Sequence, residues 1–160
     1  LLTVMLVPLC FYYSTQDSRT YLPLIAIVIT GACIVFIQEL NLFGLVGVDP
    51  WTHAGISNSV YNNGHLIFGL RYADIPLLHI LDAVIMNITD TSVFTASAIT
   101  SLLIQISSIF GVYLISYLLF HDKLLSYFSA LFVVIADQVN YMTILAIPNT
   151  LAAVFVLFVV

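Results

Sequence analysis

Charged side chains are scarce in this sequence. Three Lys and Arg residues and eight Asp and Glu residues make up only 7% of its 160 positions. A soluble domain usually carries about 25% charged residues, so this composition argues against a soluble globular domain. The formal net charge of −5 also argues against a nucleic-acid partner, because no basic patch is present to neutralise phosphates.

The common catalytic motifs are missing as well. There is no CxxC, HExxH, P-loop or GxSxG pattern, so zinc hydrolase, NTPase and serine hydrolase activities have no support. Cys10 and Cys33 both lie in apolar stretches, so a disulfide framework is not expected. The chain starts at Leu1 without Met and ends in an apolar run, 151–160, without a cap. We therefore expect a piece of a longer protein.

Long apolar runs dominate what is present, since 62% of the residues are hydrophobic. Residues 21–38 contain no charge, and eighteen helical residues at about 1.5 Å each can cross a hydrocarbon core of about 30 Å. The pattern predicts an all-α, polytopic transmembrane helical bundle. We expect helices at about 1–13, 21–38, 75–88, 95–120, 124–136 and 150–160, with a long external loop at 39–73.

The loop 39–73 holds five of the seven glycines and the only Trp. Asp49 suits a helix N-cap, Pro50 a first helical position, and Gly64 a C-terminal stop. These residues predict a short helix that lies at the membrane interface and is anchored by aromatic side chains. Its apolar side would contain Trp51, Ile56, Val60 and Tyr61.

Asp49 and His53 are the leading candidates for chemistry in this loop. They lie one helical turn apart and so share a face. A carboxylate at a helix start is stabilised by the free N–H groups and stays ionised, able to hold a metal or accept a proton. The alternative interpretation is that Asp49 only caps the helix and that His53 hydrogen-bonds to it.

Three further polar residues are candidates for substrate contacts. His79 and Asp82 lie three positions apart in an apolar segment, so they form either a polar wall of a cavity or an Asp–His or Asp–Ser bond between helices. Arg71 could bind a lipid phosphate, or it could mark the membrane interface. The helix expected at 95–120 carries a face of small and polar residues that predicts close helix packing: Ser97, Ser101, Gln105, Ser108 and Gly111.

Two stretches carry a resemblance to a known family. The segment GVDPWTH, residues 47–53, resembles the G-x-D-P-W-x-H pattern of archaeal oligosaccharyltransferase catalytic subunits, which are GT-C glycosyltransferases. The segment YADIPLLH, residues 72–79, resembles the Y-x-x-x-P-L-x-x element of protein mannosyltransferase-like and aminoarabinose transferase-like members. The order of elements over residues 21–160 is similar too. The chain departs from the archaeal pattern at Thr52 and Gly55, where that pattern has an aromatic and a basic residue.

The resemblance implies a membrane glycosyltransferase, of which this chain is an N-terminal part. Its donor would be a polyprenyl-phosphate-linked sugar and its acceptor a protein or a lipid. Asp49 matches the acid that orients or activates the acceptor, with a divalent cation (Mg²⁺ or Mn²⁺) in the oligosaccharyltransferase branch, and His53 matches a supporting residue. Asp137 and Asp122 are candidates for a second acidic position. The loop would face the extracytoplasmic side of a prokaryotic plasma membrane.

Two other classes of function remain open. A secondary transporter could use His79 and Asp82 as an intramembrane proton or cation relay, although no repeat is visible in the sequence. A membrane scaffold subunit would use its polar residues only to join helices. In that case neither Asp49 nor Asp82 would matter except for stability.

Overall fold

The computed structural model describes residues 2–14, 21–42, 48–66 and 76–136 of the chain. These residues form helices and no strand, so the expected all-α fold class is confirmed for them. The helices are α1 Leu2–Ser14, α2 Leu22–Leu42, α3 Val48–Asn63, α4 Leu77–Thr89, α5 Val93–Phe120 and α6 Lys123–Ile135. The helix expected at 150–160 lies outside the described residues.

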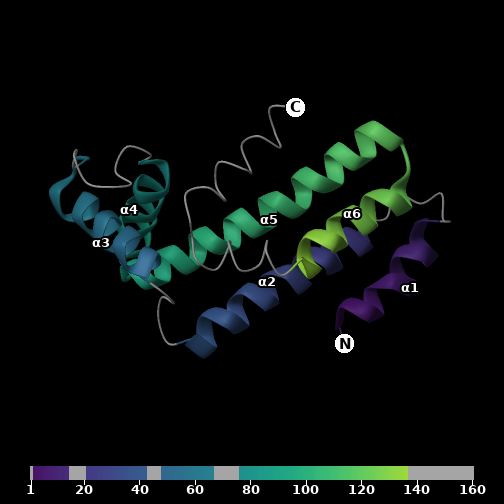
Figure 1. The fold of residues 1–160 in the computed structure, drawn as a ribbon, viewed down its shortest axis with the longest axis horizontal. Coiled ribbons are helices and arrows are strands. Elements are labelled where there is room, and N and C mark those ends of the chain that lie inside the picture. The colour runs from purple at the N-terminus through teal and green to yellow at the C-terminus, as the bar shows by residue number, and fades with distance from the viewer. Residues whose placement is uncertain (1, 15–20, 43–47, 67–75, 137–160) are drawn as a thin grey trace.

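α5 is the central element of the structure (Figure 1). Its C-terminal part packs against α2 and α6, and α1 contacts both of these helices. Near its N-terminal end lie α3 and α4, which pack on each other and on α5. We call α1, α2, α6 and residues 105–120 of α5 the bundle, and α3, α4 and residues 93–104 of α5 the end unit. The end unit thus lies where α2 ends and α5 begins.

α5 is the one helix among the described residues that is long and apolar enough to cross a membrane. The apolar stretches Leu22–Ile37, Leu77–Thr89 and Lys123–Ile135 are shorter. The 13 residues of α4 measure about 20 Å at about 1.5 Å per residue, less than the hydrocarbon core of about 30 Å. α4 therefore does not span a membrane by itself.

The ends of α5 and α6 are fixed by short-range polar contacts. At the start of α5, the Ser92 hydroxyl accepts a hydrogen bond from the backbone N–H of Thr95 at 3.4 Å. α5 ends where His121 adopts a left-handed conformation with φ of 51°. Asp122 then caps α6, because its carboxylate accepts the N–H of Leu125 at 3.1 Å. The two-residue link turns the chain back, so α6 packs on α5.

The core of the bundle is apolar and closely packed. Its helices approach closely at Gly31, where an added Cβ would lie 2.8 Å from Ile109 Cδ1 and 3.3 Å from Val134 Cγ2. Any larger residue at this position of α2 would have to displace buried side chains of α5 and α6. The buried core residues are Leu6, Cys10, Leu24, Ile27, Ile109, Tyr113, Tyr127, Ala130, Leu131, Val133 and Val134.

Many outward-facing side chains are large and apolar, while the buried ones include several polar groups. α4 is the clearest case: His79 and Asp82 are 0% and 1% exposed, whereas Val84 and Ile88 are 45% and 78% exposed. α2 and α5 follow the same pattern, with exposed residues that include Ile25, Ile29, Phe36, Leu103, Phe110 and Leu114. Rows of exposed apolar side chains beside buried polar ones are unfavourable in water.

α3 begins and ends close to the expected positions but buries a different face. It stops before Gly64, which has φ of 68° and donates its N–H to the Val60 carbonyl at 2.9 Å. Ile56 and Val60 are buried against α4, whereas Trp51 is 53% exposed and contacts the ring of Phe94. The prediction that Trp51 shares one apolar side of α3 with Ile56 and Val60 is therefore wrong, because Ile56 and Val60 pack against α4 and are buried there.

Two expected boundaries shift by a few residues. α2 continues to Leu42, so the first positions of the expected loop 39–73 are helical. α3 begins at Val48, which puts Asp49 inside the first turn of the helix and not at the cap. Sequence patterns fix helix ends only to within a few residues, because the last turns depend on what they pack against.

Candidate functional site

A buried polar cluster joins the three helices of the end unit. α4 contributes His79 and Asp82, whose spacing of three places both on the face that packs against α3 and α5. α3 contributes His53 and Ser57, one turn apart, and α5 contributes Thr100. All five side chains are at most 3% exposed. The cluster therefore forms the polar core of the end unit.

Asp82 is the centre of this cluster. Its Oδ1 accepts the hydroxyl of Thr100 at 2.6 Å, and its Oδ2 accepts the hydroxyl of Ser57 at 3.0 Å. Ser97 of α5 also hydrogen-bonds the carboxyl group. Burial raises the pKa of Asp82 above its ordinary value of 3.8, and the hydroxyl donors partly oppose this rise because they stabilise the charged form.

The hydrogen-bond directions fix the tautomer of His79. Ser57 has one hydroxyl proton, and it is donated to Asp82. Nδ1 of His79 lies 3.2 Å from the same Ser57 oxygen, so this ring nitrogen must carry the proton and donate it. The result is a continuous chain of donors from His79 through Ser57 to Asp82, running from α4 to α3 and back to α4.

His53 extends the cluster toward the start of α3. Its ring stacks on that of His79, with centroids 5.2 Å apart and an angle of 26° between the planes. Asp49 lies one turn before His53 on the same helix, in the first turn of α3. The backbone of α3 therefore connects the candidate catalytic acid to the buried cluster over a single turn.

The geometry limits what this cluster can do chemically. Ser57 is 0% exposed and donates its proton to a carboxylate, not to a histidine, so it is not arranged as an activated nucleophile. Among the residues that the structure describes, no group of three or more His, Cys, Asp or Glu side chains could hold a metal ion. What the arrangement can do is hold three helices in register and pass a proton between His79 and Asp82.

The structure brings together three of the seven candidate residues singled out from the sequence, while Asp122 caps α6 at the far end of α5. His53, His79 and Asp82 lie in one cluster, and the Asp–Ser bond between helices that the sequence left open is present between Asp82 and Ser57. Arg71 and Asp137 lie outside the described residues. Asp49 is placed on the backbone of α3, and its side chain is not described.

Ser57 and Thr100 were not identified from the sequence. Ser57 lies one turn after His53, and Thr100 lies three residues after Ser97, so each shares a face with a residue already noted. Helical periodicity could therefore have included both. It could not have shown that they would meet Asp82, because this meeting depends on how three helices cross.

Comparison with known proteins gives no match, since no family model, curated protein or solved structure is significantly similar to this chain.

Proposed function

We propose that this chain is part of an integral membrane glycosyltransferase of the GT-C type. The enzyme would transfer a sugar from a polyprenyl-phosphate-linked donor to a protein or lipid acceptor. The observation that carries the proposal is the position of the GVDPWTH segment. It opens α3 at the end of the bundle, where α2 ends and α5 begins, with Asp49 in the first turn of the helix.

The inverted burial pattern supports placement in a membrane. Exposing Val84 and Ile88 while burying His79 and Asp82 is unfavourable in water but favourable in hydrocarbon. α5, with 28 residues, is long enough to span, and its buried face carries Ser97, Thr100 and Ser101, as in membrane helices that pack through small polar residues. The proposed location is the plasma membrane of a prokaryote, with the end unit on the extracytoplasmic side.

In the proposed reaction, Asp49 accepts the proton of an acceptor hydroxyl or amide. The acceptor oxygen or nitrogen attacks the anomeric carbon with inversion, and the polyprenyl phosphate leaves with the electron pair of the broken bond. The start of a helix favours an ionised carboxylate, which is the form that can accept a proton. His53, held by its stack on His79, is a positioning residue that fixes the first turns of α3.

A divalent cation, Mg²⁺ or Mn²⁺, would take Asp49 as one of its oxygen ligands. Mg²⁺ and Mn²⁺ favour several oxygen ligands, yet the nearest described candidate on α3, His53, is buried against His79. No step of the proposed reaction is therefore assigned to a cation.

The decisive test compares Asp49→Asn with wild type in membranes that contain the full-length protein. The assay measures transfer from labelled polyprenyl-phosphate sugars to an acceptor. Loss of a general base typically lowers the rate about 10²- to 10⁴-fold, so transfer should fall by at least about 100-fold. Asp90→Asn is the matched control, because Asp90 is exposed and Asn tolerates its left-handed conformation. Full activity of Asp49→Asn would refute the proposal.

Membrane placement has its own test, because Trp51 is the only tryptophan in the chain and is 53% exposed. Lipids brominated near the head group should quench its fluorescence more strongly than lipids brominated near the chain end, as expected for an interfacial tryptophan. Equal, weak quenching by both would mean that α3 does not lie at a membrane interface.

A second candidate function is favoured by one observation, the donor chain from His79 through Ser57 to Asp82. A secondary transporter could use this chain as a proton relay. In that case Asp82→Asn should abolish proton-coupled uptake while Asp49→Asn leaves it unchanged. If the protein is a glycosyltransferase, Asp49→Asn should lower sugar transfer more than Asp82→Asn does.

A further inference from the structure

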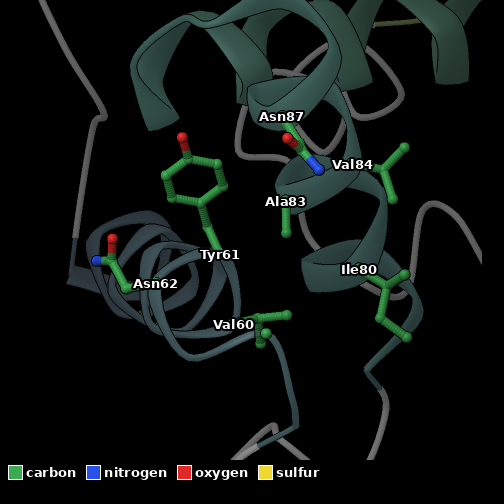
Figure 2. A pocket seen from close by; sticks show the side chains of 8 residues that line it. Val60, Tyr61, Asn62, Ile80, Ala83, Val84 and Asn87 are labelled. Carbon is green, nitrogen blue, oxygen red and sulfur yellow. The ribbon is translucent and has the colours of Figure 1, made fainter.

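A groove of about 550 Å³ lies between α3 and α4, apart from the buried polar cluster. It is open to the outside and has walls from both helices. Figure 2 shows the side chains that surround it. The ones that matter here are Val60, Tyr61 and Asn62 of α3 and Ile80, Val84 and Asn87 of α4.

The two ends of the groove differ in polarity. The Tyr61 hydroxyl and the Asn87 amide lie toward one end, whereas Val60 and Ile80 lie toward the other (Figure 2). Asn62 adds a second amide on the α3 side. These groups donate and accept neutral hydrogen bonds, and the Tyr61 ring is 40% exposed. An aromatic ring beside amides suits a ligand with several hydroxyl groups.

The apolar wall is continuous with the outer surface of α4. Ile80 and Val84 line the groove and are also 37% and 45% exposed. They belong to the same outward row as Leu77 and Ile88, at helical spacing. If this row faces lipid, as the proposed function implies, a chain from the bilayer can enter the groove sideways without crossing water.

None of the lining residues that the structure describes carries a charged side chain. Binding a phosphate head group would require a cation, since proteins hold phosphates mainly with Arg, Lys or clustered N–H groups. Lys123 is the only Lys or Arg among the residues that the structure describes, and it lies at the far end of α5 from the end unit. The described polar groups of the groove are thus neutral hydrogen-bond donors and acceptors, which match the hydroxyl groups of a sugar.

We propose that the groove between α3 and α4 binds a membrane lipid with a neutral, hydroxyl-rich head group, that is, a glycolipid. Its hydrocarbon chain lies along Ile80 and Val84, and its head-group hydroxyls bond to Tyr61 and Asn87. The proposal rests on the membrane placement in the proposed function but not on sugar transfer. It also differs from the proposed donor, whose head group carries a phosphate.

Photocrosslinking of the full-length protein in lipid nanodiscs tests this site. Three probes carry the same diazirine acyl chain: a glucosyl diacylglycerol, a diacylglycerol and a phosphatidylglycerol. Mass spectrometry then counts adducts on α4. We expect the glucosyl probe to label the segment with Ile80 and Val84 at least fivefold more than the other two. Equal labelling by all three would overturn the proposal.

Variants separate the head-group contacts from the chain contacts. Asn87→Ala and Tyr61→Phe should each lower the glucosyl preference about fivefold, the effect of one hydrogen bond of about 1 kcal/mol. Val84→Phe should reduce labelling of the groove by all probes. The matched controls are Asn58→Ala and Leu103→Phe, which make the same chemical changes at exposed positions away from the lining. Unchanged preference in both Asn87→Ala and Tyr61→Phe would overturn the proposal.

The failures of the two proposals are distinguishable. If the probes label the outer faces of α4 and α5 equally, membrane placement stands and only the glycolipid site falls. If no probe labels either helix, the membrane placement fails and the glycolipid site fails with it. Loss of sugar transfer in Asp49→Asn has no bearing on the labelling, because that variant leaves Tyr61, Asn87, Ile80 and Val84, which the proposal uses, unchanged.

Discussion

The bundle and the end unit bury polar groups in two different ways. In the bundle, a buried hydroxyl usually bonds to its own helix: Thr30 donates to the Ala26 carbonyl at 2.8 Å, and Ser126 donates to the Asp122 carbonyl at 2.6 Å. In the end unit, the hydroxyls of Ser57 and Thr100 instead reach another helix and meet one carboxylate.

This difference decides what holds each region together. A hydroxyl that hydrogen-bonds to the carbonyl four residues earlier has its partner within its own helix and does not constrain the neighbouring helix. The packing of the bundle therefore depends on the shapes of apolar side chains. A hydroxyl bonded across helices fixes which residues face each other, because an unpaired buried polar group costs about 1–3 kcal/mol. Two contacts in the bundle also cross between helices, because Ser116 and Ser129 lie 3.1 Å apart and Tyr113 hydrogen-bonds to Tyr127, and both link α5 to α6.

The largest loss of stability is expected for a substitution in the apolar core of the bundle. Ile109 is fully buried at the close approach of α2, α5 and α6. Ile109→Ala should lower the free energy of unfolding by about 2–5 kcal/mol, because it leaves a cavity. Leu103→Ala, on the outward-facing side of the same helix, should cost far less. Thermal denaturation in detergent measures both, and equal losses would mean that the core of the bundle is not tightly packed.

A smaller loss of stability is expected for a substitution in the buried polar cluster of the end unit. Asp82→Ala leaves the hydroxyls of Ser57 and Thr100 without their acceptor and should destabilise the protein by about 1–3 kcal/mol. Asp82→Asn keeps one acceptor oxygen and should cost less. The same thermal measurement gives the ranking. If the Asn and Ala variants are equally unstable, the hydrogen bonds are not what holds α3 and α5 against α4.

The smallest expected effect is a pH dependence confined to the end unit. Because burial raises the pKa of Asp82 above 3.8, the folded state binds this proton more tightly than the unfolded state. The stabilisation that this proton gives to the folded state is fully present below pH 3.8. It is lost as the pH rises through the pKa of Asp82 in the folded protein. Asp82→Asn has no carboxyl group at this position, and both proteins contain His53 and His79, so the difference between the two proteins isolates Asp82.

The wild type should therefore lose stability relative to Asp82→Asn as the pH increases from about 3.5 to 7. The observable is the difference in Tm between the two proteins across this range. A constant difference would show that Asp82 does not change its protonation in the folded protein.

Helical periodicity predicted part of the candidate site. A spacing of three placed His79 and Asp82 on one face, and a spacing of four placed His53 on the face of Asp49, without any tertiary information. The same rule failed for the exposed side of α3, where Ile56 and Val60 pack against α4. Periodicity defines which residues share a side, but not whether that side faces another helix or the surroundings.

The positions of the helices follow from local sequence, because long apolar runs broken by Ser92, His121 and Asp122 leave few other solutions. The polar residues available to the core can be read from the sequence as well. The approach of Ser57 and Thr100 to Asp82 from two different helices, and the outward turn of the apolar row of α4, come from the packing of the helices. Both outcomes depend on the crossing of helices that are distant in the chain, and local patterns carry no information about that crossing.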